Sequence, residues 1–179
     1  MRVPRLIKVS LVIAVVSAGA WGRQTDKAEH PAISPVAPVV FDHLTLERTQ
    51  CYGECPIYRI TIDGTGRVTF EGERFTKFIG TDHWQLSGSD LTRLQTAIGA
   101  IRFFELRDEY KYGDDACPVS ETDAPSAIMT ITAGGRTKRV EHYYGCFLDT
   151  SIDHGVYPRD LFEFASMVDE IVGTNRRLR

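Results

Sequence analysis

Short segments of alternating apolar and polar residues constrain the fold of this chain more than any other feature. The pattern occurs at residues 44–47, 58–62 and 68–70, and again at 127–132 and 137–143. Turns rich in Gly join 58–62 to 68–70 and 127–132 to 137–143, so each pair should form an antiparallel hairpin. A less regular strand is expected from 75 to about 81. The sequence thus predicts a sheet of about five to six strands.

Two other segments have the three- and four-residue apolar spacing of amphipathic helices. The first runs from Leu91 to Ile101, with Ser87 or Ser89 available as its N-cap. The second begins at Pro158, a residue suited to the first helical position. Its apolar stripe consists of Leu161, Phe164, Val168 and Ile171. Hairpins cannot build a parallel sheet, so we predict an α+β two-layer sandwich, an antiparallel sheet with both helices on one face.

The chain begins with the three-part layout of a secretory signal peptide. Arg2, Arg5 and Lys8 precede an apolar run at 9–16, and small residues end at Ala20. The run is shorter than the ~20 apolar residues that span a bilayer. We therefore expect cleavage after residue 20, no stable membrane span afterwards, and a periplasmic or secreted protein.

The remaining chain divides by composition into three parts. Residues 21–41 contain Pro31, Pro35 and Pro38 and are expected to form an extended tether. Residues 42–173 have a length that suits one domain with a single core. Residues 174–179 form a basic tail that we expect to be frayed and solvated.

The charge of the chain argues against nucleic acid as a partner. The formal net charge is -3, and removal of residues 1–20 would make it -6, because that segment holds three basic residues and no acidic one. An acidic chain without a basic stripe repels the phosphate backbone.

Four cysteines, Cys51, Cys55, Cys117 and Cys146, form an even set in a chain expected to be exported. Such a set favours two disulfides. We expect Cys51 to pair with Cys55, and Cys117 with Cys146, because the second hairpin brings the latter two together. Closing the longer loop should stabilise the fold by about 3.5 kcal/mol, and closing the short one by about 2 kcal/mol. The short bridge therefore either shapes a turn or takes part in chemistry.

Redox chemistry at the short bridge does not fit its surroundings. An activated thiolate is usually placed at a helix N-terminus, with two residues between the cysteines. Here three residues intervene and a strand is expected to follow. Glu54, next to Cys55, would also disfavour a thiolate by like-charge repulsion.

The alternative function is that of a thiol-based copper metallochaperone or redox protein that uses Cys51, Cys55 and Pro56. The run from Cys51 to Pro56 is similar to the Cys-x-x-x-Cys-Pro motif of exported copper chaperones of the Sco type. That resemblance implies a thioredoxin fold and a copper site made by Cys51, Cys55 and a distant histidine, here His142 or His154. Thiolates suit reduced copper. However, the strand hairpin expected after Pro56 does not fit a thioredoxin fold.

A wider pattern resembles the bacterial domain of unknown function numbered 6438. Its residues are Leu46, Arg48, Cys51, Tyr52, Gly53, Cys55, Pro56, Tyr58, Asp63, Gly64 and Val68, then Phe103, Phe104 and Leu106, then Thr122, Asp123, Pro125 and Ser126, and finally Lys138, Val140, His142 and Tyr143. The resemblance spans most of residues 44–145 and implies a common domain, but it supplies neither catalytic residues nor a ligand and so implies no mechanism. Cys117 and Cys146 are not part of the pattern.

The candidate functional surface consists of Arg48, Tyr58, Asp123 and His142. Arg48 is expected to bind carbonyls of the Cys51–Cys55 turn or to pair with Asp123, and His142 is interpreted as a surface strand residue. The acidic segment 114–123 lacks the spacing of a calcium loop, and no nucleophile motif is present. We therefore favour a non-catalytic binding domain without a cofactor, whose ligand is an unknown protein or small molecule.

Overall fold

The computed structural model describes residues 37–111, 113, 117, 119–146 and 159–178. The predicted signal peptide, most of the tether, His154 and Pro158 lie outside these residues. The strands are β1 (His43–Arg48), β2 (Ile57–Asp63), β3 (Arg67–Arg74), β4 (Gly80–Gln85), β5 (Glu109–Tyr110), β6 (Ser126–Ala133) and β7 (Arg136–Tyr143). The helices are α1 (Gly88–Ala100), the 3-10 helix η1 (Phe103–Glu105), α2 (Arg159–Val172) and α3 (Asn175–Leu178). None of the described helices is long and apolar enough to cross a membrane.

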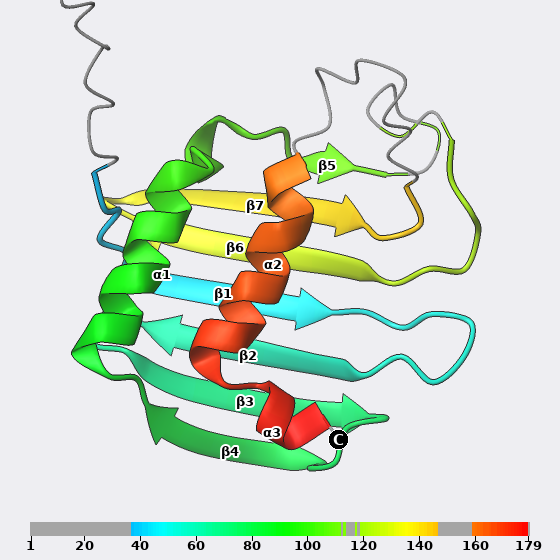
Figure 1. Cartoon of the computed structure of the whole chain (residues 1–179), viewed down its shortest axis with the longest axis horizontal. Coiled ribbons are helices and arrows are strands. Elements are labelled where there is room, and N and C mark those ends of the chain that lie inside the picture. The colour runs from blue at the N-terminus through cyan, green and yellow to red at the C-terminus, as the bar shows by residue number, and fades with distance from the viewer. Residues whose placement is uncertain (1–36, 112, 114–116, 118, 147–158, 179) are drawn as a thin grey trace, which may run out of the picture. The chain divides into compact units, whose positions relative to one another are not determined.

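The fold is α+β. Its described strands form one mixed sheet in the order β4-β3-β2-β1-β6-β7-β5 (Figure 1). The prediction of a purely antiparallel sheet of five to six strands is wrong, because there are seven described strands and β5 pairs with β7 in parallel. The remaining neighbours are antiparallel. A two-residue strand such as β5 is too short for a period-two pattern, so its position depends on tertiary packing.

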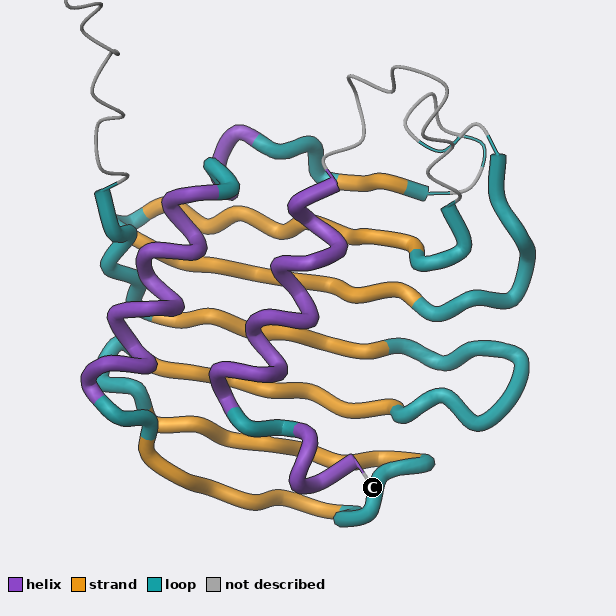
Figure 2. Tube along the Cα trace, in the orientation of Figure 1, coloured by secondary structure: helices purple, strands orange, loops and turns teal. Residues whose placement is uncertain are grey.

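The fourth strand begins at Gly80 and not at residue 75. Residues 75–79 connect β3 to β4, and their apolar side chains Phe75, Phe78 and Ile79 are exposed. Apolar residues in this segment led to the prediction of a strand, although their side chains do not belong to the core. Figure 2 shows this connection as a loop at the same end of the sheet as the loop between β1 and β2.

Alternation along the strands separates a buried face from an open face. Leu44 and Leu46 of β1 are buried, as are Ile60 and Ile62 of β2. Figure 1 shows α1 and α2 side by side in front of the sheet, and Leu94 and other residues of both helices join the same core. Helix α1 is capped by the Ser87 side chain, which accepts a hydrogen bond from the N–H of Asp90.

The opposite face of the sheet carries a row of threonines. Thr45 of β1 lies opposite Thr61 of β2 and Thr130 of β6, and Thr61 lies opposite Thr69 of β3. All four are partly buried. Threonine pairs of this kind stabilise neighbouring strands, which explains why this face needs no apolar side chains in the row.

The C-terminal residues do not form only a frayed tail, because 175–178 fold as α3 against the edge of the sheet. The Arg177 guanidinium lies 3.6 Å from the ring centroid of Trp84 and donates to Asp82 Oδ2 at 2.7 Å. Asp82 Oδ1 accepts the backbone N–H of its neighbour His83 at 2.8 Å. The two oxygens of Asp82 therefore bind α3 and the backbone of β4 at once.

Both expected disulfides are confirmed, with Cα–Cα distances of 5.7 Å for Cys51–Cys55 and 5.3 Å for Cys117–Cys146. Their sequence separations are 4 and 29 residues. We predict that C117S/C146S lowers the free energy of unfolding by about 3.5 kcal/mol and C51S/C55S by about 2 kcal/mol, because the longer loop restricts the unfolded chain more. Denaturant unfolding of the two variants checks this order, and an equal or larger loss for C51S/C55S would contradict it.

Candidate functional site

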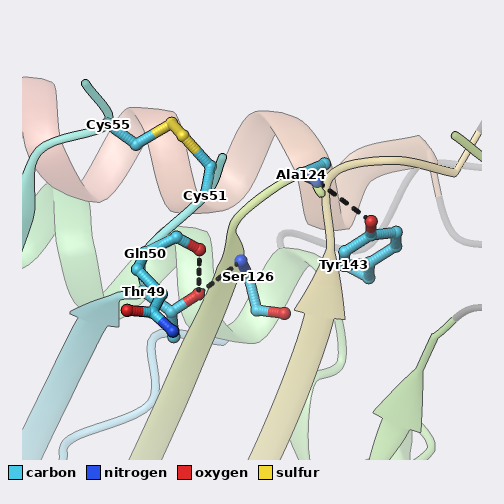
Figure 3. Close-up of a disulfide and its surroundings, with 7 residues drawn as sticks. All are labelled: Thr49, Gln50, Cys51, Cys55, Ala124, Ser126 and Tyr143. Carbon is cyan, nitrogen blue, oxygen red and sulfur yellow. Dashed lines mark hydrogen bonds between the residues drawn. A yellow bond between two sulfur atoms is a disulfide. The ribbon is translucent and has the colours of Figure 1, made fainter. Parts of the chain in front are cut away.

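The loop closed by Cys51 and Cys55 joins β1 to β2 and stands at the end of the sheet (Figure 3). Tyr52 within it is 90% exposed. The backbone N–H of Tyr52 donates to the carbonyl of Asp123 at 2.9 Å, in the segment before β6. The loop is thus fixed by the disulfide and by a contact with a distant part of the chain, while its aromatic side chain remains in solvent.

The segment before β6 is held against the same loop. Thr49 Oγ1 accepts the N–H of Ser126 at 2.7 Å, and the N–H of Thr49 donates to the Ser126 carbonyl at 3.0 Å (Figure 3). The Tyr143 hydroxyl accepts the N–H of Ala124 at 3.0 Å and donates to the carbonyl of Glu121 at 2.9 Å. Segments that are far apart in the sequence therefore meet at one end of the sheet.

A buried ionic cluster lies beneath this end, between the sheet and α2. Arg48 Nε and Nη2 donate to Asp169 Oδ2 at 3.2 and 2.6 Å, and Arg48 Nη1 donates to the Tyr144 hydroxyl. The Tyr58 hydroxyl donates to Asp169 Oδ1 at 2.8 Å. The ion pair is well shielded, because the Arg48 and Asp169 side chains are 14% and 10% exposed.

Local structure explains why these side chains meet. Arg48 continues the buried face of β1 two residues after Leu46, and its register partner in β2 is Tyr58. Both therefore point toward the helix layer. Asp169 lies on α2 beside Val168 and Val172, within the buried stripe of that helix.

The cluster shifts the acid–base properties of its members. Burial by itself would lower the pKa of Arg48, but the adjacent Asp169 carboxylate, with Tyr144 and Tyr58, raises it overall, so the guanidinium stays charged. The pKa of the Tyr58 hydroxyl is raised by burial and by the negative charge of Asp169. Tyr58 is therefore a neutral hydrogen-bond donor, and Arg48 is the permanent positive charge of the cluster.

His142 is buried and not a surface residue. It is 0% exposed, because it lies on β7 at the same parity as the buried Val140. Its ring stacks on Tyr144 at a centroid distance of 4.8 Å and meets Phe162 edge-on at 5.8 Å. Burial and the nearby positive charge of Arg48 lower the pKa of His142 to about 4, so the imidazole is neutral at pH 7.

The structure thus brings three of the four candidate residues, Arg48, Tyr58 and His142, into one cluster. Asp123 is exposed and lies against the disulfide loop through its backbone, while Arg48 pairs with Asp169 instead. The sequence interpretation missed Asp169 and the role of Tyr144. The available signal was an acidic residue inside the apolar stripe of the last helix.

The copper alternative would need changes from the structure described. Cys51 and Cys55 are bonded to each other, so neither sulfur is a thiolate ligand until the bridge is reduced. His142 lies in the core behind the stacked Tyr144 ring. Among the described residues no group of three His, Cys, Asp or Glu side chains is arranged to hold a metal ion.

An open groove of about 570 Å³ lies beside the disulfide loop. It extends from the end of β1 across β2 and β3 to the start of β4, and Thr49 and Gln50 form part of its rim. Arg59 on its floor pairs with Glu47 at 3.2 Å and with Glu71 at 3.9 Å. These side chains alternate with the buried ones, so the groove opens on the face of the sheet opposite α1 and α2.

Comparison with protein families shows that residues 42–172 match a family model described as a domain of unknown function (DUF6438). No curated protein matches the sequence. The match spans every described strand, α1, η1 and α2, and it therefore includes the disulfide loop, the groove and the ionic cluster.

We predict that Asp169→Asn lowers the free energy of unfolding by about 3 kcal/mol, because it leaves the Arg48 charge buried without a counter-ion. Tyr58→Phe should cost about 2 kcal/mol, the net value of one hydrogen bond to a charged group. Denaturant unfolding measures both, and the double variant should cost less than the sum because the two share Asp169. The control is Asp108→Asn, which removes an exposed carboxylate that pairs with Lys138 and should change stability little. Equal effects of the two Asp variants would contradict the prediction.

Acid should destabilise the fold through His142. The folded-state pKa lies below the unfolded value of about 6.5, so as the pH falls the unfolded chain binds the proton first. This loss begins near pH 6.5, grows until about pH 4 and then stays constant, reaching about 3 kcal/mol. In the His142→Leu variant, the free energy of unfolding should depend less on pH in that window than it does in the wild-type chain. The exposed His83→Gln is the matched control, and a slope that both variants leave unchanged would refute the assignment.

Proposed function

We propose that this chain, which belongs to the family described as a domain of unknown function (DUF6438), is an exported binding domain without a catalytic step of its own. Its recognition surface is the disulfide loop from Cys51 to Cys55 together with the adjacent groove. The partner is a protein or a small molecule. Two disulfides and the signal-like segment 1–20 support a location in the periplasm or the medium, where disulfides persist.

The observation that carries the proposal is the contrast between Tyr52 and the buried cluster. Arg48, Asp169 and Tyr58 are occupied with one another inside the fold. Tyr52, by contrast, is 90% exposed on a loop that the disulfide and the bond to Asp123 hold in place. A fixed, exposed aromatic side chain can bind a partner without losing much conformational entropy.

The groove adds polar selectivity beside the loop that carries this aromatic group. Arg59 is half exposed and already shared between Glu47 and Glu71, so a ligand group can exchange with one of these partners. The exposed Gln50 side chain at the rim offers a further amide donor and acceptor. An aromatic anchor beside a polar groove is an arrangement that binding surfaces use.

The test places a photoreactive phenylalanine analogue at position 52 of the full chain in an exporting bacterium. We expect a discrete adduct on irradiation, and we expect the same substitution at Arg136, at the opposite end of the sheet, to give none. C51S/C55S should remove the adduct, because the loop loses its fixed shape. Native mass spectrometry of the purified chain detects a bound small molecule, which Arg59→Ala should release. Failure of both readouts would refute the proposal.

Thiol chemistry separates this proposal from the copper alternative. Protein purified without reductant should show four blocked cysteines, as in the two disulfides. Its mature N-terminus should lie near residue 21 if the leader is cleaved. Free thiols that bind one copper ion per chain through Cys51 and Cys55 would favour the metallochaperone, and turnover abolished by one substitution without unfolding would favour an enzyme.

A further inference from the structure

The β3–β4 hairpin ends in an exposed apolar tip, defined here as residues 74–79. Phe75 and Phe78 are each 41% exposed and Ile79 is 61% exposed. They account for three of the eight large apolar side chains that are exposed in the described part of the chain. Such a concentration in five consecutive residues indicates a contact surface, because scattered apolar exposure is normal and clustered exposure is not.

Basic side chains surround this tip. Arg74 and Lys77 belong to it, and α3 brings Arg176 and Arg177 beside it, because the carbonyl of Arg177 accepts the N–H groups of Lys77 at 2.8 Å and Phe78 at 3.3 Å. Figure 1 shows α3 next to this hairpin. The basic residues at the end of the sequence therefore belong to a composite surface with the hairpin.

The local charge of this surface is opposite to that of the whole chain. The tip and α3 contribute four basic side chains. The acids near them include Glu73, Asp82, which is paired with Arg177, and Glu170, which is paired with Arg93. The whole chain has a net charge of -3. Charges more than about 8–10 Å apart are screened at physiological salt, so a ligand at the tip experiences mainly the local positive charge.

We propose that the hairpin tip and α3 dock on the surface of an anionic lipid bilayer. Phe75, Phe78 and Ile79 enter the headgroup region, and Arg74, Lys77 and Arg176 contact lipid phosphates. Apolar side chains within a ring of cations suit this interface. The three apolar side chains of the tip are exposed and do not line the groove beside the disulfide loop. A lipid surface accepts exposed apolar side chains without a complementary pocket. The proposal does not depend on the binding role of that loop.

Vesicle binding of the full chain tests the proposal. Vesicles of equal parts phosphatidylglycerol and phosphatidylcholine should bind the chain more tightly than phosphatidylcholine vesicles. R74Q/K77Q should weaken binding to the anionic vesicles about 30-fold, at about 1 kcal/mol per basic residue. Ile79→Ser should weaken it by roughly tenfold through the lost apolar contact. The matched control R67Q/R136Q removes two exposed charges at the other end of the sheet and should bind as wild type.

Hydrogen exchange locates the contact independently of any contribution from residues 1–20. Anionic vesicles should slow exchange at 74–80 and 175–178 in the wild-type chain and not in R74Q/K77Q. Equal weakening by both double variants, or protection confined to other segments, would overturn the proposal. Absence of vesicle binding would also overturn it and would leave an acidic protein surface as the occupant of the tip.

Discussion

The rest of the structure depends on the burial of Arg48 against Asp169. The two residues are 121 positions apart, and their ion pair joins the last residue of β1 to α2. A buried charge costs several kcal/mol unless its partner is in place. The ion pair can form only when α2 lies at one position along its axis on the sheet. Apolar contacts alone would tolerate small shifts of the helix.

This ion pair also connects the core to the loops at the end of the sheet. Arg48 is followed directly by Thr49, which binds Ser126 through two hydrogen bonds, and then by the disulfide loop. Tyr58 resumes the chain on the other side of that loop and binds the same carboxylate as Arg48. The residues on both sides of the loop thus bind one residue of α2. The position of the loop therefore depends on where α2 lies on the sheet.

Local patterns in the sequence were sufficient to predict the hairpins, the two long helices and the disulfide pairing, because alternation, capping and hairpin geometry act over short distances. They were insufficient for β5, whose pairing is set by tertiary packing, and for the start of β4, where exposed apolar residues imitate a strand. The burial of His142 was readable from its shared parity with Val140. Asp169 was harder to find, because a helical stripe is recognised by its apolar members, and its partner lies on a different element.

The carboxylate of Asp82 has a consequence for how copies of the chain meet. β4 is the outermost strand on its side of the sheet, and such a strand offers unpaired backbone groups to any passing chain. At its centre the N–H of His83 is bound by Asp82, which Arg177 holds from α3. A further strand would have to displace that carboxylate before it could extend the ladder. Arg177 of α3 thereby opposes the pairing of this sheet edge with a strand of another copy.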